Sequence, residues 1–212
     1  MSPAARKNGR VRPGIALAIL EALRKVDTPE EALEDEAFHR SLPRRLGLSD
    51  VVSSQMRRYA DLRDRGGAVE EGEFRDLLRL IGRRPDAHRV FAVAGRRLAE
   101  EHLDRPRGLT RLARRLYPEP LRRRLVLRCL GRAARALSPG RTLHRETRPL
   151  SMSVEDCLLA SSVEAVSACE ILTAAATVCV EHLWQNGGVA QHPSCVGRGD
   201  DRCIWTVEDH SG

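Results

Sequence analysis

The sequence predicts an α+β fold, in which N-terminal helices pack on a small antiparallel sheet with a buried C-terminal helix and a closing hairpin. Up to about residue 137, apolar residues recur mostly at the three- and four-residue spacing of amphipathic helices. Residues 142–155 then contain Leu143, Leu150, Met152 and Val154, with polar residues between the last three, and such alternation is typical of a half-buried strand. Residues 169–184 are apolar on nearly every face, and two short apolar runs joined by a glycine-rich turn follow them.

The first 66 residues predict a basic tail and a helical extension. Residues 1–13 are polar and basic and are expected to be disordered. Helices are expected over residues 15–26, 30–40 and 49–65, and Thr28, Pro29 and Glu31 form a good start signal for the second. Gly66 and Gly67 interrupt the pattern, so we place a boundary between an extension at 14–66 and a domain at 67–209.

Within the domain at 67–209, the sequence predicts further helices before the sheet. They are expected over residues 70–81, 85–103, 109–116 and 121–137, with breaks that contain proline or glycine. A strand within residues 142–155 follows, and residues 157–166 are compatible with either a strand or the approach to a helix. A buried helix over 169–184 and a hairpin of residues 189–195 and 203–207 complete the domain.

Composition limits the class of protein. Hydrophobic residues make up 42% of the 212 residues and charged residues 31%, which is ordinary for a soluble globular protein. No stretch approaches the roughly 20 apolar residues of a membrane span, and residues 1–14 contain no apolar signal region. We therefore expect a cytoplasmic protein, in which its six cysteines are reduced and a cluster of them indicates a metal before a disulfide.

Positive charge is concentrated in residues 105–148. This segment contains fourteen arginines and two acids, so its net charge is +12. Because the whole chain has a net charge of +7, the other residues together are acidic, with a net charge of −5. The simplest interpretation is the solvated face of a long amphipathic helix, and a protein partner could dock on it. Binding of nucleic acid is not expected, because no helix-turn-helix, zinc finger or interleaved aromatic residues accompany the arginines.

Three cysteines near the C-terminus form the strongest chemical motif. Cys169, Cys195 and Cys203 are spaced 26 and 8 residues apart, and the last two lie at the shoulders of the hairpin turn. Thiolates are good zinc ligands, and a structural zinc site needs four ligands, so a fourth must come from elsewhere. Cys157 is the preferred fourth ligand.

Glu155 and Glu164 are the alternative fourth ligands. Two other interpretations of the cysteines stay open. They could be small buried hydrophobic residues, or Cys195 and Cys203 could form a disulfide. A closed four-ligand site would be structural, because it leaves no position for a reactive water. Cys129 and Cys179 lie on apolar helix faces, so we expect them in the core.

The order of features over about residues 67–207 resembles the 4-vinyl reductase domain family, which is related in fold to subunits of TRAPP vesicle-tethering complexes. The residues that carry the resemblance are Gly95-Arg96-Arg97-Leu98-Ala99, Val154-Glu155-Asp156-Cys157, the helix opened by Cys169, and Cys195-x-x-x-Gly199-Asp200-x-x-Cys203. The cysteine spacing is similar to that in the sensory domains of phenol-responsive transcriptional activators. The resemblance to those domains implies zinc bound through three cysteines and a glutamate.

The length of the chain and its segment at residues 116–121 are similar to short proteins of bacteriochlorophyll biosynthesis. Those proteins are named for reduction of the 4-vinyl (8-vinyl) group of divinyl protochlorophyllide. The chain departs from the pattern at Cys169-Glu170, where a Cys-Trp or Cys-His pair is usual. It also contains no ATPase or DNA-binding module of the kind found in the activators.

The resemblance implies a hydrophobic cyclic ligand. Our leading expectation is binding or delivery of a chlorophyll-pathway tetrapyrrole in support of 8-vinyl reduction. A small-molecule sensor or adaptor that acts through a protein partner is the alternative, and a genuine reductase comes third. Whether the chain is an enzyme stays open, because it contains neither a Gly-x-Gly-x-x-Gly dinucleotide fingerprint nor a Cys-x-x-Cys motif.

A tetrapyrrole would be expected between the helical layer and the sheet. Apolar side chains would line such a pocket, an arginine would pair with ligand carboxylates, and a histidine would ligate the central magnesium. The residues chosen for these roles are Phe91, Arg96, Leu98, Leu172, His182 and Trp184. Pairing through helices into a homodimer is compatible with the resemblance.

Overall fold

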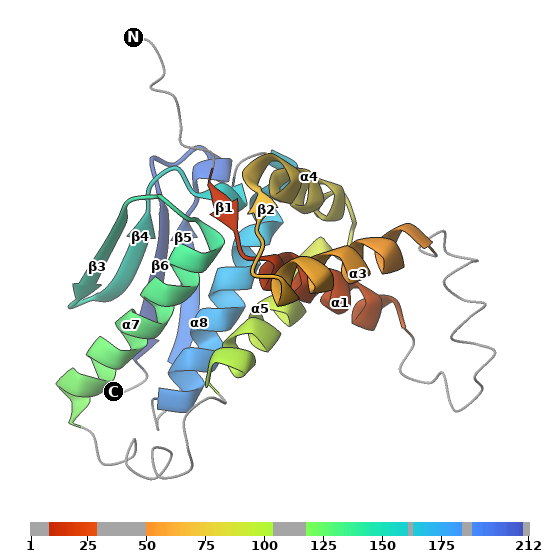
Figure 1. The fold of residues 1–212 in the computed structure, drawn as a ribbon. Helices are drawn as coiled ribbons and strands as arrows, with labels where there is room; N and C mark the ends of the chain where they lie inside the picture. The colour runs from red at the N-terminus through yellow and green to blue at the C-terminus, as the bar shows by residue number, and fades with distance from the viewer. Residues whose placement is uncertain (1–8, 29–49, 104–117, 161–162, 184–187, 210–212) are drawn as a thin grey trace.

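The computed structural model of the chain describes residues 9–28, 50–103, 118–160, 163–183 and 188–209 (Figure 1). Over these residues it contains six α-helices, a two-stranded sheet and a four-stranded antiparallel sheet. The predicted α+β class is confirmed. The helices expected over residues 30–40 and 109–116 lie outside the described residues.

The N-terminal part forms two helices and a short strand pair. Helix α1 (Pro13–Asp27) has an apolar sequence, and nine of its residues are buried. Helix α3 (Asp50–Asp64) packs against it. Strand β1 (Arg10–Val11) pairs antiparallel with β2 (Val69–Glu70), so the last residues of the predicted tail are paired with the start of the following domain.

Helices α4 (Glu71–Gly82) and α5 (Ala87–Leu103) follow, close to their predicted bounds. Arg84, between them, lies 2.5 Å from an oxygen of Asp27 and 2.8 Å from one of Asp86. These ion pairs connect the end of α1 to the start of α5.

Two further helices cover the sheet. Helix α7 (Glu119–Leu137) contacts β3 and β4, and helix α8 (Glu170–Leu183) contacts β5. Two 3₁₀ turns, η1 (Leu158–Ala160) and η2 (Val163–Cys169), lead into α8 and settle the segment that the sequence left open. Among the described residues no helix combines the length and apolar character needed to cross a membrane.

The layers follow one another as sheet, then α7 and α8, then α5, then α1 and α3 (Figure 1). The N-terminal helices were expected on the sheet itself, whereas the structure packs α1 against α5 and α3. The physical reason is α8, which is apolar all round. It must be covered by the sheet and α7 on one side and by α5 on the other.

The four-stranded sheet has the order β3-β4-β6-β5. Its strands are β3 (Leu143–Thr147), β4 (Leu150–Val154), β5 (Gly188–Ser194) and β6 (Cys203–Asp209), and the closing hairpin of β5 and β6 is confirmed. The single strand expected in 142–155 is instead the hairpin of β3 and β4, which turns at Arg148 and Pro149. Strand β3 is almost wholly exposed, so its sequence carries no alternation that could reveal it.

Candidate metal centre

Four potential metal ligands from three parts of the chain meet at one end of the sheet. Cys169 is the last residue of η2, His192 lies in β5, Cys195 follows β5, and Cys203 begins β6. Their ligand atoms all lie within 4.8 Å of one another. The three cysteines are fully buried, so the sulfurs are shielded from water.

Two of the sulfur–sulfur distances match the edges of a metal tetrahedron. The Sγ of Cys195 lies 3.9 Å from that of Cys169 and 4.0 Å from that of Cys203. A zinc–sulfur bond of about 2.3 Å in a tetrahedral site places two sulfurs about 3.8 Å apart. A disulfide would instead bring them to about 2.05 Å, and the cysteines are unbonded.

His192 supplies the fourth donor of this group, and sequence reasoning missed it. Its ring stacks on Trp205, with centroids 4.4 Å apart and the planes 12° from parallel. The Nε2 atom is buried and has no hydrogen-bond partner among the described residues. Burial, together with nearby Arg198, lowers the pKa of His192 to about 4, so its imidazole is neutral and able to ligate a metal at neutral pH.

One signal could have pointed to His192. Gly188 and Ala190 are buried along β5, and His192 continues this period of two onto the same face of the sheet. A histidine at an inward strand position beside a cysteine turn is a better ligand candidate than a histidine judged alone.

The turn between the two hairpin cysteines explains the Gly-Asp part of the motif. The Asp200 carboxylate accepts a hydrogen bond of 2.6 Å from the backbone N–H of Cys195, and the Asp200 N–H donates back to the Cys195 carbonyl. Gly199 has φ +99°, a left-handed conformation that glycine adopts without strain. The turn thereby fixes the backbone on which Cys195 is carried.

The protonation of the thiols also favours a cation. The pKa of Cys195 is lowered to about 6, because the Cys169 thiol donates to it and the backbone N–H groups of Gly197 and Arg198 assist. The pKa of Cys169 and that of Cys203 are raised, first because each donates to Cys157. The lowered pKa of Cys195 favours its thiolate, the form in which a cysteine binds a metal ion.

Cys157, the fourth ligand preferred from the sequence, is buried beside the group. Its thiol accepts hydrogen bonds from Cys169 and Cys203, which lower its pKa well below the usual value. Cys157 is thus the alternative to His192 as the fourth metal ligand. Glu155 is half exposed and pairs with His144 at 3.2 Å, and the side chain of Glu164 lies outside the described residues.

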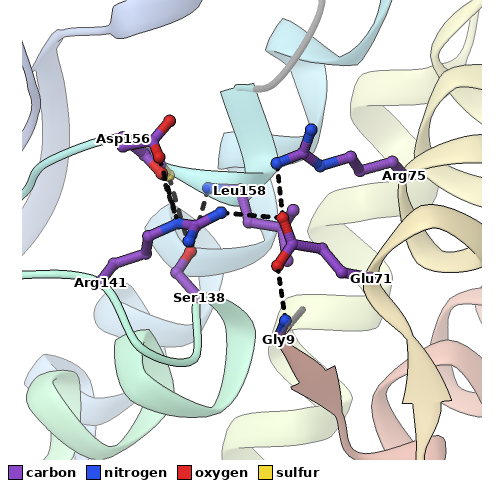
Figure 2. Close-up of polar contacts among 8 residues, drawn as sticks. Gly9, Glu71, Arg75, Ser138, Arg141, Asp156 and Leu158 are labelled. Atoms are coloured by element: carbon purple, nitrogen blue, oxygen red, sulfur yellow. Dashed lines mark hydrogen bonds and ion pairs between the residues drawn. The ribbon is translucent and has the colours of Figure 1, made fainter. Parts of the chain in front are cut away.

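A polar network holds the segment that carries Cys157 (Figure 2). Ser138 Oγ accepts a hydrogen bond of 3.3 Å from the N–H of Leu158 and lies 3.9 Å from the Cys157 sulfur. Arg141 donates to the Asp156 carbonyl and also pairs with Glu71 at 2.8 Å.

Glu71 connects this network to the residue before β1. Its carboxylate accepts a hydrogen bond of 3.1 Å from the Gly9 N–H and pairs with Arg75 at 2.5 Å (Figure 2). Residues before α1, in α4 and after α7 thus support the position of Cys157 together.

The residues expected to bind a cyclic ligand are dispersed between core and surface. Phe91 and Leu172 are fully buried in the main core, and Leu98 packs against it. Arg96 and His182 are exposed. Trp184 lies outside the described residues.

Arg96 and His88 lie near the carboxyl group of Glu170, where a charged ligand can be bound. Burial raises the pKa of Glu170, the first residue of α8, and the nearby His88 and Arg96 oppose that shift. Two basic groups therefore lie around a half-buried carboxyl above the packing of α5 on α8.

The arginine-rich segment is described from residue 118. On α7 the side chains of Arg124, Arg128, Arg132 and Arg135 are exposed, whereas Arg123 pairs with Glu119 at 2.6 Å. This agrees with the solvated helix face that the sequence favoured.

Compared with protein-family models, curated proteins and solved structures, the chain shows no significant match. Its function is therefore inferred from the chemistry of its own residues.

Proposed function

We propose that this chain is a metal-binding domain that holds one zinc ion through Cys169, His192, Cys195 and Cys203. The observation that carries the proposal is the convergence of four ligand atoms within 4.8 Å of one another, three of them on fully buried thiols. Buried polar atoms normally have partners, and the orphaned Nε2 of His192 would gain one from the metal.

Zinc is the ion that suits this donor set. Three thiolates and one imidazole are soft and borderline donors, and tetrahedral sites of this composition select zinc over calcium or magnesium. With all four positions taken by protein, the ion would be structural. It would connect the β5–β6 hairpin to the start of α8, two parts of the chain that are 26 residues apart at Cys169 and Cys195.

The test is metal content by elemental analysis of the full chain, purified without a metal-affinity tag. We expect one zinc per chain, lost in Cys203→Ser. Cys129→Ser is the matched control, because Cys129 is a cysteine outside the group, and this variant should keep its zinc. A wild-type protein that is folded by circular dichroism but binds no zinc, even after refolding with the ion, would overturn the proposal.

As a second candidate function, we propose binding of a hydrophobic ligand that carries a carboxylate, of the tetrapyrrole type that the 4-vinyl reductase resemblance implies. The supporting observation is the pair of basic groups, His88 and Arg96, around Glu170 at the junction of α5 and α8. A propionate of such a ligand could pair with Arg96, while its ring meets the apolar side chains between the helices. In this proposal the fold is of the TRAPP-like type.

Titration of the zinc-loaded chain with protoporphyrin IX, followed by its absorption and fluorescence, tests this second candidate. Saturable binding that weakens about tenfold in Arg96→Gln, as expected for the loss of one charge-assisted contact, supports it. Arg89→Gln, another exposed arginine on α5, is the control. Binding unaffected by Arg96→Gln would contradict the assigned site, and no binding would favour the sensor or adaptor function. Turnover of a divinyl pigment with a nicotinamide donor would instead make the chain a reductase.

A further inference from the structure

A second pair of thiols lies away from the metal centre, between two helices. The Sγ of Cys129 in α7 and the Sγ of Cys179 in α8 are 2.7 Å apart. Each sulfur has a van der Waals radius of about 1.8 Å, so the two atoms are inside non-bonded contact and within reach of a bond. The cysteines are 50 residues apart in the chain and carry no disulfide in the structure.

We propose that Cys129 and Cys179 form a reversible disulfide that crosslinks α7 to α8 under oxidising conditions. The chemistry supplied from outside is a two-electron oxidant of the hydroperoxide class, and a dithiol reductant reverses the reaction. This pair is distinct from the metal ligands, and the proposal does not depend on zinc binding.

The surroundings of the pair allow access from one side. Cys179 is buried in a small apolar cluster with Ala99, Ala175 and Val178, and Cys129 packs on its edge and is partly exposed. An oxidant in solution therefore reaches Cys129 first, and Cys179 is in place behind it.

The electrostatics of α7 favour Cys129 as the thiol that reacts first. The described part of α7 carries six arginines and one acid, Glu119, so Cys129 lies in a positive environment that stabilises a thiolate. The hydrogen bond to Cys129, followed by burial, raises the pKa of Cys179. The buried Cys179 is therefore the less readily ionised of the two thiols.

The reaction balances in two steps. The Cys129 thiolate attacks one oxygen of hydrogen peroxide and the O–O bond breaks. The hydroxide that leaves takes up a proton from the solvent, equivalent to the one that Cys129 released on ionising, and becomes water. The Cys129 sulfenic acid then meets the Cys179 thiol. A sulfur–sulfur bond forms, the S–O bond breaks, and a second water leaves with the thiol proton, so that two thiols are oxidised and one peroxide is reduced.

The test is peroxide treatment of the zinc-loaded full chain, followed by alkylation of the remaining thiols and peptide mapping. Cleavage with trypsin and a glutamate-specific protease releases Cys129 in residues 129–132 and Cys179 in residues 171–181, so each thiol is alone in its peptide. We expect a crosslinked pair of these peptides, which disappears on reduction with dithiothreitol. Zinc release, followed with a chromogenic chelator, should lag behind crosslinking, because the ligand thiols are buried.

Cys179→Ser and Cys129→Ser separate the roles of the two thiols. In Cys179→Ser we expect trapping of a Cys129 sulfenic acid by dimedone, whereas in Cys129→Ser the buried Cys179 should stay reduced. Circular dichroism confirms that each variant is folded, and Cys179→Ala replaces Cys179→Ser if the hydroxyl is not tolerated. The proposal would be overturned if Cys129 and Cys179 were oxidised no faster than the zinc ligands. It would also be overturned if they were oxidised without forming the crosslinked peptide.

Discussion

Gly95 in α5 lies directly against the backbone carbonyl of Ile171 in α8. A Cβ at position 95 would stand 2.9 Å from the Ile171 carbonyl carbon and closer still to its oxygen. Glycine therefore sets how closely the two helices approach, and α5 and α8 form the most extensive helix contact among the described elements. Because α8 also positions Cys169 at its start, this contact bears on the metal centre.

Gly95→Ala is expected to destabilise the protein strongly. The added methyl group meets backbone atoms, which cannot rotate away, so α5 must move from α8 at a cost of about 3 kcal/mol, at the upper end for overpacking. Urea unfolding followed by circular dichroism measures the change. Gly72→Ala in α4 is the matched control, because nothing lies within 4 Å of its added methyl group. That control should be neutral or stabilising by up to about 1 kcal/mol, and equal effects of the two substitutions would disprove the close approach.

A second prediction concerns the fourth metal ligand. Loss of a residue that only hydrogen-bonds to a metal ligand typically weakens metal binding roughly 10- to 100-fold. His192→Ala removes a ligand itself, so it should weaken zinc binding by more than this. Cys157→Ser should weaken it less, because the group of His192, Cys169, Cys195 and Cys203 remains. Competition with a chelator of known zinc affinity gives both values, and the cobalt-substituted spectrum reports the number of thiolates. The reverse order of effects would assign the fourth position to Cys157.

Removal of the metal should destabilise the fold. An ion that binds only the folded chain stabilises it by about 2.7 kcal/mol when its free concentration is 100 times the dissociation constant. We therefore expect a chelator to lower the unfolding midpoint and added zinc to restore it. In parallel, the buried Cys195 and Cys203 should become reactive toward a thiol reagent. A midpoint that a chelator leaves unchanged, in protein shown to have lost its zinc, would contradict a structural role for the ion.

The sequence predicted most of the helices and the hairpin that carries Cys195 and Cys203, because both depend on local patterns. Apolar spacing identified α7, and the turn residues Gly199 and Asp200 have a local backbone role. The split of residues 142–155 into β3 and β4 escaped prediction, since an exposed edge strand does not alternate.

The rest of the site depends on contacts between distant parts of the chain. His192 reaches the cysteines through the register of β5 on β6 and its stacking on Trp205. The approach of Cys129 to Cys179 depends on how α7 packs on α8. Neither contact can be predicted from the spacing of residues within one segment.

The ion pairs around Arg84 give the last prediction, a dependence of stability on pH. The hydrogen bond from Arg84 lowers the pKa of Asp86 in the folded chain, against the opposing effect of burial. A carboxyl whose folded pKa is depressed contributes stability that is fully present above its unfolded pKa, about 3.9 for aspartate. That stability is lost as the pH falls from there through the lower folded value.

Replacing Arg84 with methionine should remove this contribution and separate the end of α1 from the start of α5. We expect Arg84→Met to be less stable than wild type at pH 7, and the difference to shrink as the pH falls below about 4. Because these side chains are about one-third exposed, the effect of the Asp86 pair should be modest. Arg83→Met, a substitution of the exposed neighbouring arginine, is the control. Urea midpoints of the three proteins between pH 3 and pH 7 test this, and a difference that stays constant down to pH 3 would show that Arg84 acts through packing rather than charge.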